Sequence, residues 1–196
     1  MKKLILFLAL FICYYSSSHS QLIYYQWNPV SSPVTNNLNF IYNNATNYVI
    51  ACNDGKIIYR NPQQTNWNIA PAIVTSNLYS LFGTSALYSV GASGKIIKST
   101  DNGVTWSNVP SPTTKNINST SAFVTQNYRI ICGDGGMIFT TTNQGTNWNQ
   151  VPSGTTNSLR QIYYSNSISA YRNYICGDYG TFLKLIYLLP LPVSIN

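Results

Sequence analysis

Few residues of this chain could perform acid–base chemistry. Its 196 residues include one histidine, no glutamate and four aspartates. Each aspartate lies within two residues of a glycine, at Asp54, Asp101, Asp134 and Asp178. Aspartate beside glycine is typical of tight turns, whereas most glycosidases need two carboxylates that face one bond. We therefore expect the chain not to be an enzyme.

The cysteines offer little for metal chemistry. Cys52, Cys132 and Cys176 are far apart in sequence, and no histidine follows residue 19. A zinc site usually combines histidines with closely spaced cysteine pairs, so we expect no metal and no cofactor. Cys132 and Cys176 occupy matching ICGD strings. Equivalent positions in neighbouring repeats usually lie farther apart than a disulfide allows, so we expect buried free thiols, with a Cys132–Cys176 bridge as the alternative.

The basic and aromatic residues suggest binding without high charge density. The chain carries a net charge of +7, only 8% charged residues and 16 tyrosines. The basic side chains are scattered and form no stripe of the kind that nucleic acid requires. We expect a protein or glycan partner and no nucleic acid, because tyrosine- and asparagine-rich surfaces form adaptable hydrogen bonds. The candidate contact residues are Arg129, Arg160, Arg172, Tyr163 and Tyr164, with Tyr24, Tyr25 and Tyr171 as further candidates. The alternative for each tyrosine is that it packs on a blade face.

The first twenty residues have the pattern of an export signal. Lys2 and Lys3 precede a ten-residue apolar run, Leu4 to Cys13, and Ser18-His19-Ser20 supplies small residues before a cleavage point. Ten apolar residues are too few to span a bilayer. We predict that residues 1–20 are a signal peptide, that the protein is secreted or displayed at the cell surface, and that no membrane span remains. The alternative is an N-terminal membrane anchor.

Four tryptophans mark an internal repeat. Trp27, Trp67, Trp106 and Trp148 are 40, 39 and 42 residues apart. An aliphatic residue follows each tryptophan by eleven positions, at Leu38, Leu78, Ile117 and Leu159. A glycine precedes the last three by twelve positions, at Gly55, Gly94 and Gly136. Fixed offsets on both sides of a variable loop indicate one repeating structural unit.

Each unit contains short β-branched and aromatic runs separated by Asn, Gly, Ser and Pro, a pattern typical of strands. Beyond the signal, the sequence shows no sustained helical periodicity. Four short strands per 40 residues is the size of a β-propeller blade, whose two apolar faces are buried only by stacking on other blades. We predict an all-β propeller of about four four-stranded blades over residues 21–184, with the tryptophans filling the gaps between neighbouring blades.

The segment Ser99 to Trp106 reads S-x-D-x-G-x-T-W. It resembles the Asp-box, or bacterial neuraminidase repeat, which the family uses as a structural turn between the third and fourth strands of a blade. On this resemblance Ser99, Asp101, Gly103, Thr105 and Trp106 shape the turn. Thr141 to Trp148 is a softened copy, with Asn143 in the place of the aspartate. Residues 24–184 as a whole resemble photosystem II stability/assembly-factor repeat proteins, including those secreted by Bacteroidetes.

The fourth unit departs from the pattern. Gly180 begins a third strand, but Pro192 stands where the tryptophan is expected. Residues 185–196 form a Pro-rich tail that resembles the lead-in to a type IX secretion sorting domain; the alternative is an edge strand. Tyr24 to Trp27 looks like a fourth strand without its blade. It would complete the last blade in a closed four-bladed ring, whereas a partial propeller would expose its end blades and risk self-association.

Three functions follow from this reading. The first is a non-catalytic, secreted recognition or scaffold module. The second is an assembly-factor-like chaperone, which rests on the family resemblance alone and implies an arginine-rich patch. The third is a sialidase-like glycoside hydrolase, suggested by the Asp-box and opposed by the lack of glutamate. We favour the first.

Overall fold

The computed structural model describes residues 26–83, 86–122, 128–164 and 173–185. The chain divides into two compact units, residues 1–31 and 32–196. The described residues 26–31 of the first unit contain no strand. The second unit carries all the described strands, which form antiparallel sheets, so the prediction of an all-β propeller-type fold is confirmed.

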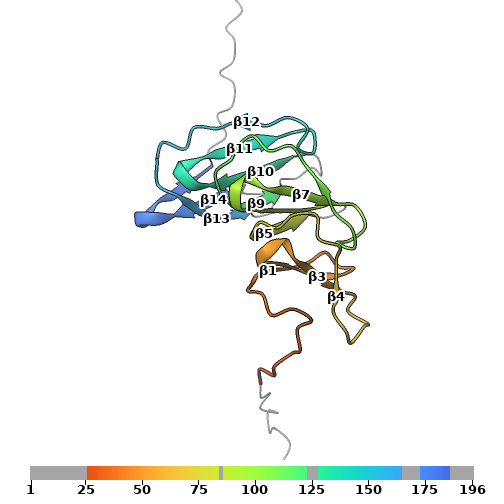
Figure 1. The fold of residues 1–196 in the computed structure, drawn as a ribbon. Helices are drawn as coiled ribbons and strands as arrows, with labels where there is room; N and C mark the ends of the chain where they lie inside the picture. The colour runs from red at the N-terminus through yellow and green to blue at the C-terminus, as the bar shows by residue number, and fades with distance from the viewer. Residues whose placement is uncertain (1–25, 84–85, 123–127, 165–172, 186–196) are drawn as a thin grey trace, which may run out of the picture. The chain divides into compact units, whose positions relative to one another are not determined.

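The second unit contains four sheets in its described residues, which we call blades 1 to 4 (Figure 1). Blade 1 consists of β1 (Leu38–Asn43), β2 (Tyr48–Cys52), β3 (Ile57–Arg60) and β4 (Asn68–Ile69). Blade 2 consists of β5 (Leu78–Gly83), β6 (Leu87–Gly91), β7 (Ile96–Ser99) and β8 (Ser107–Asn108). Blade 3 consists of β9 (Ile117–Ala122), β10 (Arg129–Gly133), β11 (Ile138–Thr141) and β12 (Asn149–Gln150). Blade 4 has three strands, β13 (Leu159–Tyr164), β14 (Asn173–Gly177) and β15 (Phe182–Lys184).

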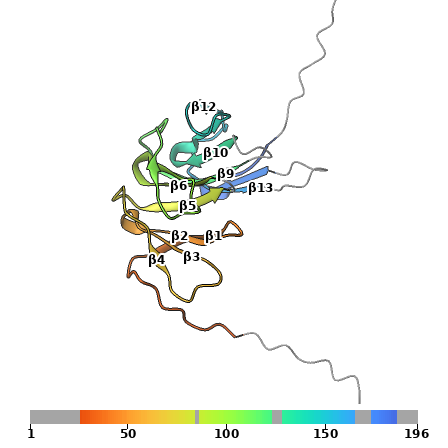
Figure 2. The ribbon, with the colours of Figure 1, turned by 90° about the vertical axis from the view of Figure 1, so that its right-hand side faces the viewer.

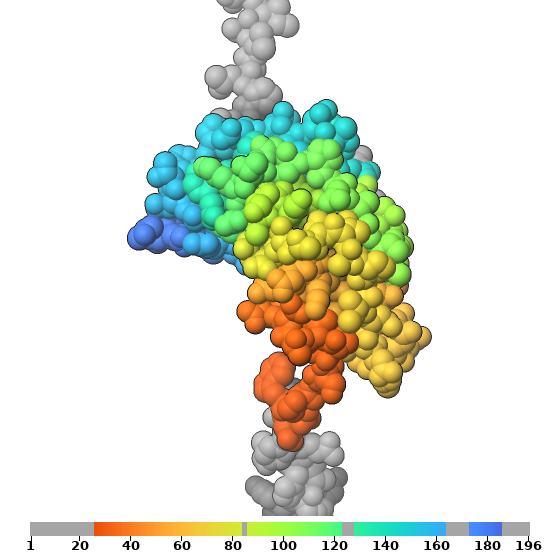
Figure 3. All heavy atoms as spheres, viewed as in Figure 1, coloured from red at the N-terminus to blue at the C-terminus, as the bar shows by residue number. Residues whose placement is uncertain are grey.

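The blades stack in chain order. Strand β5 contacts β1, β9 contacts β5, and β13 contacts β9, so the first strand of each blade lies beside that of the next. The colour bands of Figures 2 and 3 follow the same order from orange to blue within residues 32–185. We call the face of a blade toward the preceding blade its rear face and the opposite side its forward face. A strand alternates its side chains between the two faces.

Apolar residues fill each space between neighbouring blades. Val49 and Ala51 on the forward face of blade 1 pack with Leu87 and Ile97 on the rear face of blade 2. Equivalent clusters join blades 2 and 3, around Tyr88 and Ile131, and blades 3 and 4. The near-continuous apolar character of the central strands follows from this burial on both faces.

A short 3₁₀ turn joins the second and third strands of every blade. The four turns are η1 (Asn53–Gly55), η2 (Ala92–Gly94), η3 (Asp134–Gly136) and η4 (Asp178–Gly180). Gly94 has a φ of +71°, and a Cβ atom there would lie 1.9 Å from the carbonyl oxygen of Thr113, in the loop leading to blade 3. Only glycine combines this conformation with so close a backbone approach. Gly55 and Gly136 meet the carbonyls of Val74 and Thr155 in the same way.

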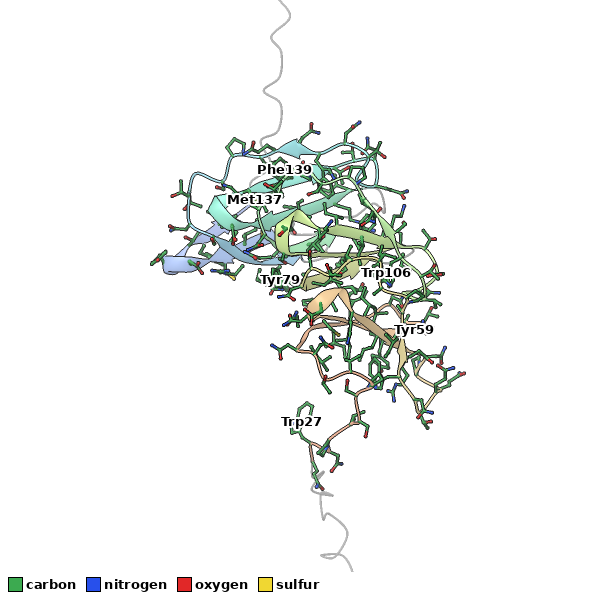
Figure 4. The ribbon with its side chains drawn as sticks, in the orientation of Figure 1. Trp27, Tyr59, Tyr79, Trp106, Met137 and Phe139 are labelled. Atoms are coloured by element: carbon green, nitrogen blue, oxygen red, sulfur yellow. The ribbon has the colours of Figure 1, made fainter. Side chains whose placement is uncertain are left out.

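The two end faces are exposed. On the rear face of blade 1, Ile41 is 60% exposed, and on the forward face of blade 4, Phe182 is 67% exposed. The described blades therefore form a partial propeller rather than a closed four-bladed ring. Trp27 (Figure 4) belongs to the first unit, residues 1–31, so its place between blades stays a prediction.

Candidate functional site

The turn from Ser99 to Trp106 is held by its own side chains. The Ser99 hydroxyl donates to Asp101 Oδ1 at 2.8 Å and accepts the backbone N–H of Gly103 at 2.8 Å. Asp101 Oδ1 also accepts the backbone N–H of Thr105 at 2.8 Å, and Asp101 Oδ2 accepts the Thr105 hydroxyl. The Trp106 indole N–H donates to the Gly103 carbonyl at 3.0 Å. The residues of the motif therefore bond to one another, which is a structural use of the carboxylate.

These bonds change the ionisation of Asp101. Burial alone would raise the pKa of this carboxyl group, but hydrogen bonds from Thr105 and Ser99 outweigh it and hold the pKa below its ordinary value. A carboxylate that accepts several hydrogen bonds is a poor proton acceptor near neutral pH. Asp101 is thus suited to stabilising the turn rather than to general base catalysis.

The corresponding turn of blade 3 uses an amide in place of the carboxylate. Asn143 Oδ1 accepts the Thr141 hydroxyl at 2.8 Å and the backbone N–H of Asn147 at 2.9 Å. The Thr141 hydroxyl in turn accepts the backbone N–H of Gly145 at 3.1 Å. The softened copy of the motif therefore keeps the geometry without the charge.

Two tryptophans lie between blades. Trp106 belongs to the cluster between blades 1 and 2 and is 8% exposed, and Trp148 packs against the cluster between blades 2 and 3. Trp106 is labelled in Figure 4. Trp67 packs on the rear face of blade 1, with Ile50 and Ile58. A repeated position thus places an indole on the rear face of its own blade.

Blade 4 leaves this indole position open. A cavity of about 390 Å³ lies between blades 3 and 4, lined by Ile130 and Val151 from blade 3 and by Ile162, Ile175 and Leu183 from blade 4. Val151 follows Trp148 by three positions, as Ala70 follows Trp67, and Ala70 lies in the Trp106 cluster. Leu183 follows the turn glycine Gly180 by three positions, just as Ile97 follows Gly94 and Phe139 follows Gly136. We call this cavity the blade 3–4 groove.

Arg129, a predicted contact residue, is buried instead. It is 1% exposed, and its Nη2 donates to the Ala86 carbonyl at 3.0 Å. Its guanidinium lies 4.5 Å from the ring centre of Tyr88. Nε and Nη1 have no hydrogen-bond partner among the described residues. Burial lowers the pKa of this group. Arg129 occupies the place of Leu87 in blade 2, so sequence alone did not distinguish this buried cation from a surface one.

Arg160 lies at the other end of its blade, beside turn η4. Its Nε and Nη2 donate to Asp178 at 2.8 and 2.6 Å, and Nη1 is 4.0 Å from Asp134 Oδ1. The hydrogen bond from Arg160 lowers the pKa of Asp178. Arg129 and Arg160 therefore do not converge. Arg129 begins strand β10, whereas Arg160 lies near Asp134, which follows the end of that strand. Tyr163 is 60% exposed on the forward face of blade 4.

Several predicted contacts lie outside the described residues: Arg172, Tyr24, Tyr25, Tyr171 and the side chain of Tyr164. The predicted signal peptide, residues 1–20, lies there as well, and so does the tail beyond Leu185. Among the described residues, no helix has the length and apolar character needed to cross a membrane.

The cysteines in the described residues are all free. Cys52 and Cys132 are buried, but Cys176 is exposed, so the expectation of burial is wrong for this residue. Burial raises the pKa of Cys52 to about 11, and it also raises the pKa of Cys132. The exposure of Cys176 arises because it lies on the forward face of blade 4, which no described residue covers.

The other carboxylates are hydrogen-bonded to neighbouring side chains. Asp54 accepts a hydrogen bond from Asn36, and Asp134 accepts hydrogen bonds from Asn116 and Asn118. Each aspartate thus bonds within or beside a turn. Within residues 26–185, as far as they are described, no three His, Cys, Asp or Glu side chains gather to hold a metal ion.

No protein-family model matches the sequence, and no curated protein matches it either. The structure is similar to YCF48 from Cyanidioschyzon merolae, with a TM-score of 0.62 and 17% identity, over 74% of this chain and 49% of that chain. It is also similar to a structure of YCF48 bound to D1 peptide, with a TM-score of 0.65 and 19% identity, over 80% of this chain and 52% of that one.

A computationally designed protein, Ika4, has the same fold. Its TM-score is 0.65 at 12% identity, over 82% of this chain and 98% of Ika4. This chain spans about half the length of the YCF48 chains that it matches. At these identities the similarities establish a β-propeller fold, and ligand and partner must be argued from the residues of this chain.

Proposed function

We propose that this chain is a non-catalytic recognition module that binds an extended protein segment in the blade 3–4 groove. The observation that carries the proposal is the cavity of about 390 Å³ at the position of the missing tryptophan, beside a sheet that has three strands in its described residues. Among the described residues, strand β15 pairs only with β14, so its other edge is open to an added strand. An added strand gains affinity from main-chain hydrogen bonds and specificity from alternate side chains that enter pockets.

The lining of the groove favours a protein partner over a glycan. Ile130, Ile162 and Ile175 are buried apolar residues at its base, and Leu183 is partly buried at its side. An apolar lining suits an aromatic side chain. One of the similar structures is named as YCF48 bound to a peptide, which supports a peptide ligand for this fold. The predicted export signal supports an extracellular or cell-surface setting.

The proposal can be tested with a peptide copied from blade 2. The probe is an acetylated, amidated peptide with the sequence of residues 104–112, and the control peptide carries alanine in place of the tryptophan. Isothermal titration calorimetry should show binding of the first peptide and at least about tenfold weaker binding of the second. Leu183→Glu should abolish binding, and Tyr163→Ser, on the opposite face of blade 4, should retain it. Equal binding of both peptides, or no binding, contradicts the proposal.

An assembly-factor-like chaperone is a second candidate, supported by the two YCF48 structures. It belongs to the same non-catalytic class and also requires a protein ligand. Of the arginines named as candidate contacts, Arg129 is buried and Arg160 is paired with Asp178, so these two do not supply the arginine-rich patch implied by the resemblance.

A further inference from the structure

The groove lies next to a second incomplete feature, the forward face of blade 4, which no described residue covers. In blades 1 to 3 the forward-face positions are covered by the next blade, and Val49, Tyr88 and Ile96 are at most 1% exposed. In blade 4 the same face carries Tyr163, Tyr174, Cys176 and Phe182, with the rings of Tyr174 and Phe182 stacked at 5.2 Å. The rear face of blade 1 is likewise partly bare. Blade 4 and blade 1 thus expose, among the described residues, the two unmatched halves of an interface that the chain forms three times internally.

We infer that a second copy of this chain fills both features, head to tail, with Trp27–Val30 of each copy completing blade 4 of the other. This inference rests on the proposed function and names its partner. Trp27 precedes Leu38 by eleven residues, and the same interval separates Trp67 from Leu78 and each later pair. In each of these later pairs, the tryptophan belongs to one blade and the aliphatic residue begins the next blade. Trp27 must therefore join a blade placed behind blade 1.

Blade 4 of the same chain is not that blade, because the rear face of blade 1 and the forward face of blade 4 are both exposed. Blade 4 of a second copy offers the missing surface. The fourth strand of each complete blade ends in a repeated hydrogen bond, in which the N–H of Ala70, Val109 or Val151 donates to the carbonyl of Ile57, Ile96 or Ile138 at 2.9–3.0 Å. The equivalent pair across two copies is Val30 N–H and Phe182 O. Pro29 lies at the preceding position, whose N–H points away from the ladder, so it is compatible with an edge strand.

The turns supply complementary backbone groups. A Cβ atom at Gly180 would meet nothing within 4 Å, unlike those at Gly55, Gly94 and Gly136, which meet the carbonyl four residues before the next aliphatic residue. The carbonyl at that offset before blade 1 belongs to Val34. The backbone N–H of Asp54 donates to Asn77 Oδ1 at 3.0 Å, and that of Ser93 donates to Asn116 Oδ1 at 3.0 Å. At the exposed ends, Tyr179 in blade 4 has the position of the N–H donor, and Asn37 before blade 1 has the position of the asparagine acceptor.

Two copies joined in this way present eight blades. One copy covers 49% and 52% of the two YCF48 chains, so a pair has the length of one such propeller. A head-to-tail interface closes into a ring when its rotation allows and otherwise produces filaments. The proposed assembly is the closed pair, which leaves no exposed end face.

Light scattering coupled to size-exclusion chromatography tests this assembly on the full-length protein. The expected mass is twice that of one chain. Trp27→Ala should raise the dissociation constant of the pair by about 30-fold or more, as for a buried interface tryptophan. Trp27 lies outside the compact unit that carries the blades, so the variant should fold normally. Gly180→Ala should also weaken the pair, because its Cβ would approach the Val34 carbonyl, and Ile73→Ala, an exposed residue in an internal loop, serves as the matched control.

Mixing the two variants tests the head-to-tail arrangement. One of the two interfaces in a mixed pair contains neither substitution, so a mixture of Trp27→Ala and Gly180→Ala should form more dimer than either variant alone. A monomer at all concentrations, a ladder of larger species, or a dimer insensitive to both substitutions overturns the inference. The peptide experiment separates the two proposals when it uses Trp27→Ala as receptor. Binding of the peptide to a protein that never dimerises leaves the groove function intact, and failure of the peptide to bind refutes that function itself.

Discussion

Asp101 and Asn143 occupy the same turn position in consecutive blades, and each accepts a backbone N–H four residues further along the chain, at 2.8 and 2.9 Å. The hydrogen bond, rather than the charge, is therefore the shared feature. The charge adds a dependence on pH that the turn of blade 3 lacks.

Asp101→Ala should lower the free energy of unfolding by about 1–3 kcal/mol at neutral pH, because the N–H of Thr105 loses its acceptor in a partly buried turn. Asp101→Asn should retain most of the stability, since blade 3 already uses asparagine. Urea titrations monitored by tryptophan fluorescence would measure both, with Asn143→Ala as the matched variant in blade 3. Equal losses for alanine and asparagine at position 101 would contradict the shared role of the acceptor.

The same position predicts the response to acid. The pKa of Asp101 is lower in the folded protein than its ordinary value of 3.8, so its stabilising contribution is present above that value and is lost as the pH falls through the lowered pKa. Asp101→Asn should therefore lose less stability than the parent between neutral pH and pH values below the ordinary aspartate range. Parallel curves of unfolding free energy against pH for the two proteins would show that the carboxylate does not titrate as described.

Trp106→Ala should reduce the free energy of unfolding by about 3–5 kcal/mol, because it empties the space between blades 1 and 2. Trp27→Ala, at the same repeat position, should change the stability of dilute protein by less than about 0.5 kcal/mol, the usual effect of an exposed substitution. Thermal and urea unfolding would compare the two. A Trp106 variant as stable as the parent would refute its role as an anchor between blades.

Arg129→Leu should leave the protein at least as stable as the parent. It replaces a buried cation that lacks partners for two of its nitrogens by the residue found at this position in blade 2, and such replacements are often neutral or stabilising. Arg129→Ala should be less stable than Arg129→Leu because it leaves a cavity. Loss of the folded state in Arg129→Leu, measured by urea unfolding, would show that the Ala86 and Tyr88 contacts outweigh the cost of burial.

Cys176 should react with maleimide faster than Cys52 or Cys132. It is exposed, whereas burial raises the pKa values of the other two thiols and shields them. Peptide mapping by mass spectrometry after brief labelling near pH 8 would assign the sites. If two copies pair as inferred, labelling of Cys176 should slow as protein concentration rises, while the two buried cysteines stay protected throughout. Early labelling of Cys52 or Cys132 would contradict their burial.

The sequence predicted the fold because its signals were local and repeated. The eleven-residue offset from each tryptophan and the twelve-residue offset from each glycine mark points where the backbone meets itself, as Gly94 meets Thr113. Such contacts tolerate few residues and therefore remain visible in one sequence. The position of each aspartate in a turn was predictable for the same reason.

The candidate site was harder to predict, because it depends on which blade lies next to which. The sequences around Cys132 and Cys176 are nearly the same, yet one thiol is buried and the other exposed, since only blade 3 has a blade in front of it. Arg129 was missed because its charge favours the surface, whereas its register places it between sheets. The absent tryptophan after Gly180 was the one available signal of the groove.

The close approach of each turn glycine to the carbonyl of the following loop has a consequence for divergence. Main chain touches main chain at this point, so the spacing from one sheet to the next is set without reference to side-chain size. The side chains between two blades can then differ while the distance between the sheets stays the same. Val49, Tyr88 and Ile130 are an example, because they occupy the same position in blades 1, 2 and 3. A backbone contact of this kind lets the blades of this chain differ in sequence while their spacing is kept.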